Sequence, residues 1–166
     1  MNFTEKEIEI LEILEKDSRL SVDTIAKMVD LEAEMVAEVI KKFEDLKVIA
    51  AYNTKINWRK TDRRELVSAM IDVKVSPKRE VGFDEIAERI YRYPEVKSVY
   101  LMSGAYDLSV VIEGESLSEV GRFVSEKLST LDSVLSTTTH FVMKKYKHDG
   151  VIFDDGEKDK RIVVSP

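Results

Sequence analysis

The order of apolar patterns between residues 66 and 147 constrains the fold of this chain more than any other feature. Apolar residues that alternate along a chain predict β-strands, and apolar residues three or four apart predict helices. Four alternating segments and two helical segments follow one another as strand, helix, strand, strand, helix, strand. This is the order of the split βαβ, ferredoxin-like arrangement, so we predict an α+β domain with a four-stranded sheet. The predicted strands are residues 66–75, 96–102, 108–112 and 134–147.

Two helices should cover one face of this sheet. The first should point Phe83, Ile86, Ala87 and Ile90 inward. The second opens with the capping-box spacing of Ser116 and Glu119, and its expected inward residues are Leu117, Val120, Val124, Leu128 and Leu131. We expect the open face to carry Ile, Val, Phe and Met side chains. Because an exposed apolar face needs a second copy or a ligand to cover it, we predict a homodimer formed through the sheets.

The connection between the second and third strands, residues 103–107, is a candidate binding site. Its sequence is Ser-Gly-Ala-Tyr-Asp, and Gly104 can adopt a positive φ or let another group approach the backbone. Asp107 places a carboxylate beside Tyr106 and Ser103, a combination that could hold an ammonium group. An ordinary hairpin, whose aspartate hydrogen-bonds its own turn, accounts for the same residues. Taken alone, these residues favour the ordinary hairpin.

Residues 1–56 carry a different pattern, that of three short helices. Thr4 and Glu7 have capping-box spacing, and Ser21 stands where a second helix needs its N-cap. A short helix followed by a tight turn and a longer helix is typical of a helix-turn-helix, although a small bundle with no nucleic-acid role has the same pattern. Residues 47–52 predict an exit into a short strand, as in a winged domain. The expected inward residues are Ile8, Ile10, Leu11, Ile13, Leu14, Ile25, Met28, Val29, Met35, Val36, Val39, Ile40, Phe43 and Leu46.

The third predicted helix is the candidate recognition helix, whose N-terminal residues would reach base edges. Carboxylates there can accept hydrogen bonds from cytosine N4, but near phosphates they mostly repel. Arg19, Lys27 and Lys55 could contact phosphates, whereas the basic cluster at residues 58–64 is more typical of a solvated linker. The outward residues of the helix are Glu34, Ala37, Glu38, Lys41, Lys42 and Asp45.

Composition argues against several classes of protein. The net charge is −6, so any contact with DNA must come from local clusters of charge. The chain has no cysteine, which excludes disulfides and fits a reducing cytoplasm. We see no targeting leader and no membrane span. With only His140 and His148 and no phosphate loop or nucleophile turn, we predict no metal site, no cofactor and no catalytic residues.

Taken together, the chain resembles the Lrp/AsnC, or feast/famine, transcriptional regulators over about residues 4–147. Each matching motif is short, and it is their common order that makes the resemblance specific. The motifs are Asp17-Ser18-Arg19-Leu20-Ser21, Val48-Ile49 followed by Tyr52, Pro94-Glu95-Val96, Gly104-x-x-Asp107 and Thr137-Thr138-Thr139.

The resemblance implies a cytoplasmic regulator that binds double-stranded DNA and is built from homodimers that often assemble into octamers. It also implies that an amino acid or similar small effector binds between the sensing domains of neighbouring dimers. Carried over, the effector cleft would be lined by Ser103, Gly104, Tyr106 and Asp107, with Thr137 and Thr139 nearby. The candidate DNA-contacting residues are Ser21, Lys27, Glu34, Glu38, Lys41 and Lys42.

The candidate recognition helix departs from the family pattern. The family usually has Ser or Thr as the cap and Arg on the exposed face, where this chain has Glu32, Glu38 and Val39. A second hypothesis is therefore a small-molecule-binding oligomer with weak or no specific DNA binding. A third, an enzyme like those relatives that decarboxylate tetrapyrroles, would need cationic or His groups in the cleft, where we see only His140.

We divide the chain into four parts. A DNA-binding domain over residues 1–56 is followed by a linker over 57–65 and an effector-binding and oligomerisation domain over 66–147. Residues 148–166 form a tail that is either frayed or, because Ile162, Val163 and Val164 favour a strand, added to a sheet edge.

Overall fold

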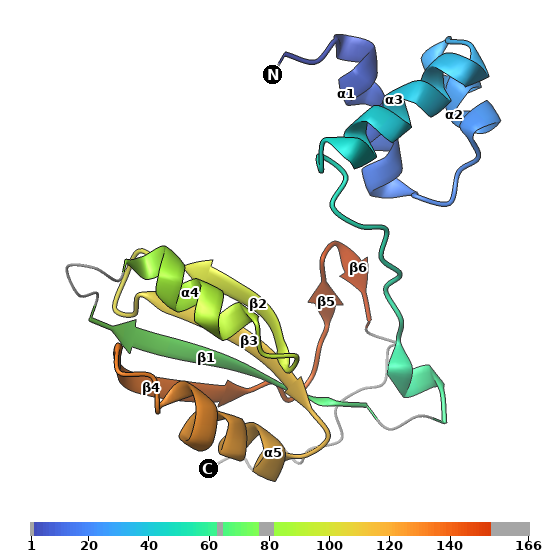
Figure 1. Cartoon of the computed structure of the whole chain (residues 1–166). Helices are drawn as coiled ribbons and strands as arrows, with labels where there is room; N and C mark the ends of the chain where they lie inside the picture. The colour runs from blue at the N-terminus through green and yellow to red at the C-terminus, as the bar shows by residue number, and fades with distance from the viewer. Residues whose placement is uncertain (1, 63–64, 77–81, 154–166) are drawn as a thin grey trace. The chain divides into compact units, whose positions relative to one another are not determined.

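The computed structural model describes residues 2–62, 65–76 and 82–153 (Figure 1). The chain divides into two units, Met1–Lys55 and Ile56–Pro166. In the described ranges, no helix combines the length and apolar character that a membrane crossing requires.

The N-terminal unit consists of the three expected helices, α1 (Glu5–Lys16), α2 (Val22–Val29) and α3 (Ala33–Asp45). The capping box of α1 is confirmed, because Thr4 Oγ1 accepts from the Glu7 amide and a Glu7 carboxylate oxygen accepts from the Thr4 amide. Ser21 caps α2 by accepting from the Thr24 amide. The helices enclose a core of Ile10, Leu14, Ile25, Ala26, Val29, Val36 and Phe43.

Several apolar residues of this unit lie outside the core. Met28 and Met35 are 54% and 51% exposed, so the expectation that both point inward is wrong. Ile8 and Leu46 are also exposed, at 41% and 43%. Each helix buries fewer apolar residues than its sequence pattern contains, because three short helices enclose only a small volume.

The expected strand at residues 47–52 is absent. Lys47 adopts a positive φ of 58°, which turns the chain back so that the amides of Val48 and Ile49 both donate to the Phe43 carbonyl. This arrangement resembles a Schellman-type helix end. The described backbone that follows has no neighbouring strand to pair with in its own unit, and an isolated strand is not stable.

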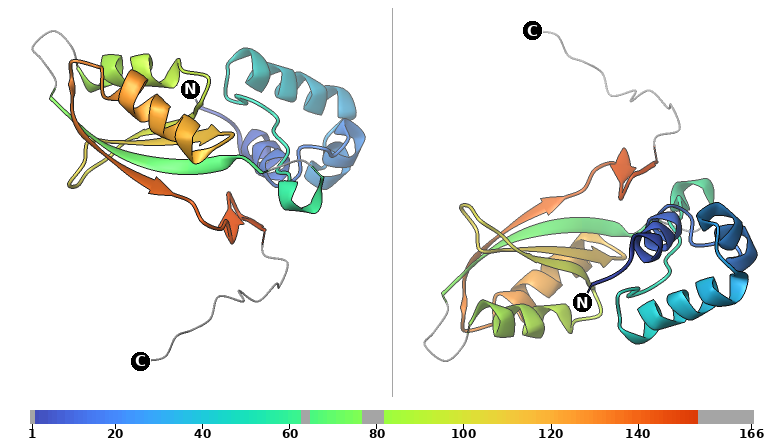
Figure 2. Two further views of the ribbon diagram at one scale, coloured as in Figure 1. Left: turned by 90° about the horizontal axis from the view of Figure 1, so that it is seen from below. Right: turned by 90° about the horizontal axis from the view of Figure 1, so that it is seen from above.

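The second unit is built on one antiparallel sheet with the order β2-β3-β1-β4. Its strands are β1 (Val67–Val75), β2 (Val96–Leu101), β3 (Leu108–Gly114) and β4 (Val134–Phe141). Helix α4 (Phe83–Tyr91) and helix α5 (Leu117–Arg122), which a π-helical segment η2 (Phe123–Leu128) continues, lie on one face of the sheet (Figure 2). The ferredoxin-like prediction is confirmed.

The core of this unit lies between the sheet and the helices. Its sheet side is formed by Ala69, Ile71, Val73, Leu108, Val110 and Ile112, all at most 1% exposed, and its helix side by Ile86, Ile90, Val120, Phe123 and Leu128. Ser116 caps α5 as expected, but Glu119 bonds to the Glu115 amide rather than to its cap. Leu117 is 59% exposed, so its expected inward position is wrong.

The open face of the sheet is more polar than expected. Strand register pairs Met70 with His140 and Val111, and Asp72 with Thr138 and Ser109. Along this face, Asp72 Oδ2 lies 3.1 Å from His140 Nε2. Met70 and Val111 fit the expected Ile, Val, Phe and Met surface, but the expectation is wrong for most of the face, because the other residues of β1 on this side are polar.

Strand β4 ends at Phe141, earlier than predicted. Pairing stops there because β1 begins at Val67, and a last bond runs from the Val142 amide to the Ser68 carbonyl. A small hairpin follows, of β5 (Lys147–His148) and β6 (Val151–Ile152), joined by Asp149 and Gly150 with φ of 44° and 81°. Asp-Gly with two positive φ values is typical of a type I′ turn. Residues 162–164, where the tail could add to a sheet edge, lie outside the described residues.

Candidate functional site

Helix α3 presents its charged residues to solvent, as predicted. Glu34, Ala37, Glu38, Lys41 and Asp45 are all exposed, on the side opposite Val36 and Phe43. Among the described residues, Glu34, Glu38 and Lys41 form no ion pair. The helix also begins without a side-chain cap, because Glu32 makes no capping bond. Its N-terminal half is therefore an acidic surface with free carboxylates.

Two candidate DNA-contacting residues, the N-cap of α2 and a residue in its last turn, differ in their availability. Lys27 is exposed in the last turn of the helix. The Ser21 hydroxyl accepts from the Thr24 amide and lies 2.8 Å from the Thr24 hydroxyl. Ser21 thus has a structural role in starting α2, whatever else it contacts.

Lys42 is engaged inside its own unit. Its Nζ donates to Glu7 Oε1 at 2.6 Å and lies 5.4 Å from the centre of the Phe3 ring. The Phe3 ring in turn packs edge-on against the buried Phe43. The hydrogen bond from Lys42, followed by that from the Thr4 amide, lowers the pKa of Glu7. This bond was not predictable from local sequence patterns, because 35 positions separate its partners.

The residues of the 103–107 loop fall into two groups. Ser103 and Gly104 are exposed, while Tyr106 and Asp107 are tied to neighbouring strands. A Cβ built on Gly104 meets nothing within 4 Å, and its φ is outside the left-handed region. The fold therefore does not require a glycine at position 104.

The Asp107 carboxylate binds a neighbouring strand. Its Oδ2 accepts from the Val75 amide at 2.9 Å, and its Oδ1 lies 3.4 Å from Lys74 Nζ. It does so where the β1–β4 pairing shifts register, between Lys74 and Val75. Neither earlier interpretation of Asp107 anticipated this bond. Removing the carboxylate would leave the Val75 amide unpaired, which costs about 1–3 kcal/mol.

The three consecutive threonines of β4 point to different faces. Thr137 and Thr139 pair with Val73 and Ile71 and share the helix-covered side of the sheet with them. Thr138 lies on the open side, where its hydroxyl is 2.9 Å from the Tyr106 hydroxyl. The structure thus brings Tyr106 to Thr138 and not to Thr137 or Thr139. Strand alternation was the signal that could have identified Thr138.

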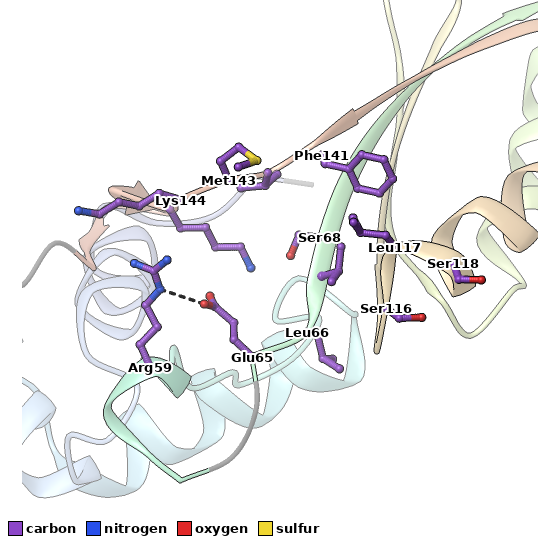
Figure 3. Close-up of a pocket in the computed structure, with 13 residues that line it drawn as sticks. Arg59, Glu65, Leu66, Ser68, Ser116, Leu117, Ser118, Phe141, Met143 and Lys144 are labelled. Carbon is purple, nitrogen blue, oxygen red and sulfur yellow. Dashed lines mark hydrogen bonds and ion pairs between the residues drawn. The ribbon is translucent and has the colours of Figure 1, made fainter. Parts of the chain in front are cut away.

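A hollow of about 600 Å³ lies at the other end of the sheet. Figure 3 shows the Arg59–Glu65 ion pair on one side of it and Phe141 with Leu117 on the other. Leu66 and Met143 add to its apolar lining. Its volume is in the range of small-molecule sites, and sequence reasoning missed it because its walls come from four separate segments.

Comparison with known proteins assigns a class to these two units. A family model described as winged helix-turn-helix DNA-binding matches residues 3–50, and one described as the Lrp/AsnC ligand binding domain matches residues 68–152. The chain is thus a transcriptional regulator with a DNA-binding and a ligand-binding domain. It belongs to the Lrp/AsnC family, as its sequence motifs predicted.

The relatives cover nearly the whole chain. The HTH-type transcriptional regulator YugG of Bacillus subtilis (strain 168) is 66% identical over 166 residues, which is 100% of both chains. The proline dehydrogenase transcriptional activator of Rhizobium radiobacter is 28% identical over 87% of this chain and 92% of its own.

Solved structures share the fold. The transcriptional regulator NMB0573 of Neisseria meningitidis, solved as a complex with L-Met, has a TM-score of 0.70 and 21% identity over 89% of this chain and 94% of its own. AsnC of E. coli has a TM-score of 0.67 and 17% identity, over 89% and 97%.

We predict that Glu7→Gln destabilises the N-terminal unit only where Glu7 would be ionised. Glutamine can keep the bond to the Thr4 amide but loses the charge that Lys42 binds. Because the pKa of Glu7 is lowered, this stabilisation is fully present above the ordinary glutamate pKa of about 4.3 and is lost as the pH falls through the lowered value. Thermal unfolding measured from pH 7 downward should show a lower melting temperature for the variant than for wild type, and this difference should disappear in acid.

The matched control is Glu12→Gln, which removes an exposed charge from the same helix. Glu12 makes no ion pair with another described residue. A difference for Glu7→Gln that stays constant with pH, or one that Glu12→Gln reproduces, would contradict the assignment.

Proposed function

We propose that this regulator binds specific double-stranded DNA through α2 and α3, and that an amino acid or similar small effector changes its DNA affinity or its assembly. The single observation that carries the proposal is the pairing, in one chain, of a helix-turn-helix with a ligand-binding domain whose exposed loop holds a glycine that the fold does not need. We place the protein in the cytoplasm, as its composition and class suggest.

The effector site that we propose is the loop of Ser103 and Gly104 together with the Tyr106 hydroxyl. A backbone without a side chain at position 104 leaves room for a ligand to reach the exposed peptide groups. Because the oxygens of Asp107 already bind Val75 and Lys74, its part in holding an ammonium group would be shared with a structural one. Thr137 and Thr139 lie on the other side of the sheet from the Tyr106 hydroxyl, so we propose for them only an indirect part, through the strand that holds Thr138.

We further propose that the chain forms a homodimer through the open face of the sheet, and that dimers assemble further into octamers. The side chains of that face can hydrogen-bond and pair charges across an interface, as Asp72 and His140 do within one chain. An effector loop near the edge of such a sheet would then be completed by a neighbouring copy.

One observation favours the alternative, a small-molecule-binding oligomer with little specific DNA binding. Lys42 is engaged by Glu7. The exposed face of α3 then has one free positive charge, Lys41, and three negative charges, Glu34, Glu38 and Asp45. This excess of negative charge weakens attraction to phosphates. Affinity that is equal for all duplexes at low salt would support the alternative.

We predict that Lys41→Ala and Lys42→Ala affect DNA binding differently. Loss of a phosphate contact reduces the slope of log affinity against log salt by about one, and we expect this for Lys41→Ala. Lys42→Ala should mainly lower the thermal stability of the N-terminal unit, because it removes the partner of Glu7. Fluorescence anisotropy on genomic fragments at several salt concentrations, with unfolding curves beside it, separates these effects. Equal changes in salt slope for both variants would contradict the prediction.

We predict that Gly104→Val leaves stability within about 0.5 kcal/mol, as for most surface changes, but abolishes effector binding. The added side chain enters open space in the free protein and would occupy the proposed site. Calorimetry with each of the common amino acids on wild type and variant provides the measurement. Gly121→Val, at another glycine whose Cβ would meet nothing within 4 Å, is the control. Unchanged amino-acid affinity in Gly104→Val would overturn the location of the site.

A further inference from the structure

We propose that Glu34 and Glu38 determine sequence specificity, by accepting hydrogen bonds from cytosine N4 amino groups in the major groove. The proposal rests on the proposed function, since it assumes that α3 enters the groove. It assigns the negative charges of this helix to base reading and predicts an operator with cytosines at the positions that the two side chains reach.

The position of the two carboxylates suits base contacts. In a helix-turn-helix, the N-terminal residues of the second helix reach base edges, and Glu34 lies in the first turn of α3. Glu38 lies four residues later, so both side chains project from one face. Their separation along the helix axis is about 6 Å, or roughly two base-pair steps of about 3.4 Å.

Neither carboxylate is used by the fold. Both residues are exposed, and neither forms a salt bridge or a side-chain hydrogen bond with the rest of the described chain. Other carboxylates of the same unit are engaged, such as Glu7 by Lys42 and Glu44 by the Tyr52 hydroxyl. Removing the charge of Glu34 or Glu38 should therefore leave the helix intact.

The chemistry of the major groove leaves a carboxylate few partners. Guanine and thymine present acceptors there, which repel it, and adenine presents its N6 donor beside the N7 acceptor. Cytosine presents the N4 donor without an acceptor of its own. A carboxylate that enters the groove loses hydrogen bonds to water. If the base offers no donor, no new hydrogen bond replaces them, so binding to a wrong base should be much weaker. Bidentate side-chain contacts discriminate between bases by roughly 5- to 150-fold, and we expect the single cytosine contact to lie at the lower end of that range.

The surrounding side chains fit the same interpretation. Ala37 and the 51%-exposed Met35 place apolar surface beside the two carboxylates, where thymine methyl groups can make contact. Two exposed cations lie near these carboxylates without pairing to them in the described structure: Lys27 in the last turn of α2, and Lys41 three residues after Glu38. Because neither lysine forms an ion pair with Glu34 or Glu38, both are available to contact phosphates.

The test is selection of binding sites by the full-length protein from a randomised duplex pool, with wild type, Glu38→Gln and the control Asp45→Asn. Both variants lose one negative charge from the same face of α3, but Asp45 is its last residue. Glutamine pairs with adenine N6 and N7. We expect the wild type to select cytosine at the base pair that Glu38 reaches. For Glu38→Gln, the ratio of adenine to cytosine at that base pair should rise by at least about 5-fold. Asp45→Asn should keep the wild-type preference.

The outcomes separate the inference from the function that it rests on. If Glu38→Gln selects the wild-type sequence and gains only the affinity that Asp45→Asn also gains, the specificity proposal is wrong while the regulator proposal stands. If wild type selects no sequence at any salt concentration, the proposed function fails as well. Circular dichroism of both variants checks that α3 is folded.

Discussion

The two-residue period of β1 is the constraint on which the second unit depends. This strand lies between β3 and β4, so its alternation sets the side of the sheet on which residues of all three strands lie. One side receives Ala69, Ile71 and Val73 and becomes the core, and the other receives Met70 and Asp72. The same parity places Thr138 beside Tyr106 and turns Thr137 and Thr139 away. The surface that we propose for dimerisation is therefore made of the residues that the β1 core does not bury.

Carboxylates in this chain divide into those that the fold uses and those that it leaves free. The Asp107 carboxylate accepts the hydrogen bond of the Val75 amide at the end of β1. Glu7 of α1 is joined to Lys42 of α3 by an ion pair. Glu34 and Glu38 do neither. Part of the negative charge of this acidic chain is thus paired within the fold, and the part that stays free includes the two carboxylates that we propose read bases.

The periodicity of apolar residues and the helix-capping residues made most of the fold predictable. The order of strands and helices, the caps at Thr4, Ser21 and Ser116, and the buried positions of β1 all follow from local pattern. Contacts between residues far apart in sequence were not predictable, including Lys42 with Glu7 and Asp107 with Val75. Strand ends were missed where pairing, rather than propensity, sets them, as at Phe141. Of the candidate site, the loop of Gly104 was found from sequence, while Thr138 and the hollow beside Phe141 needed the structure.

The central claim is that effector and DNA are linked through one chain, and linkage can be measured directly. The affinity for the selected operator should be determined with and without a saturating amino acid that binds the protein, and the affinity for that amino acid with and without operator. Reciprocity requires the two changes to be the same factor, which we expect to be about 5- to 150-fold in one direction. Operator affinity that does not change when the amino acid is bound would contradict the account.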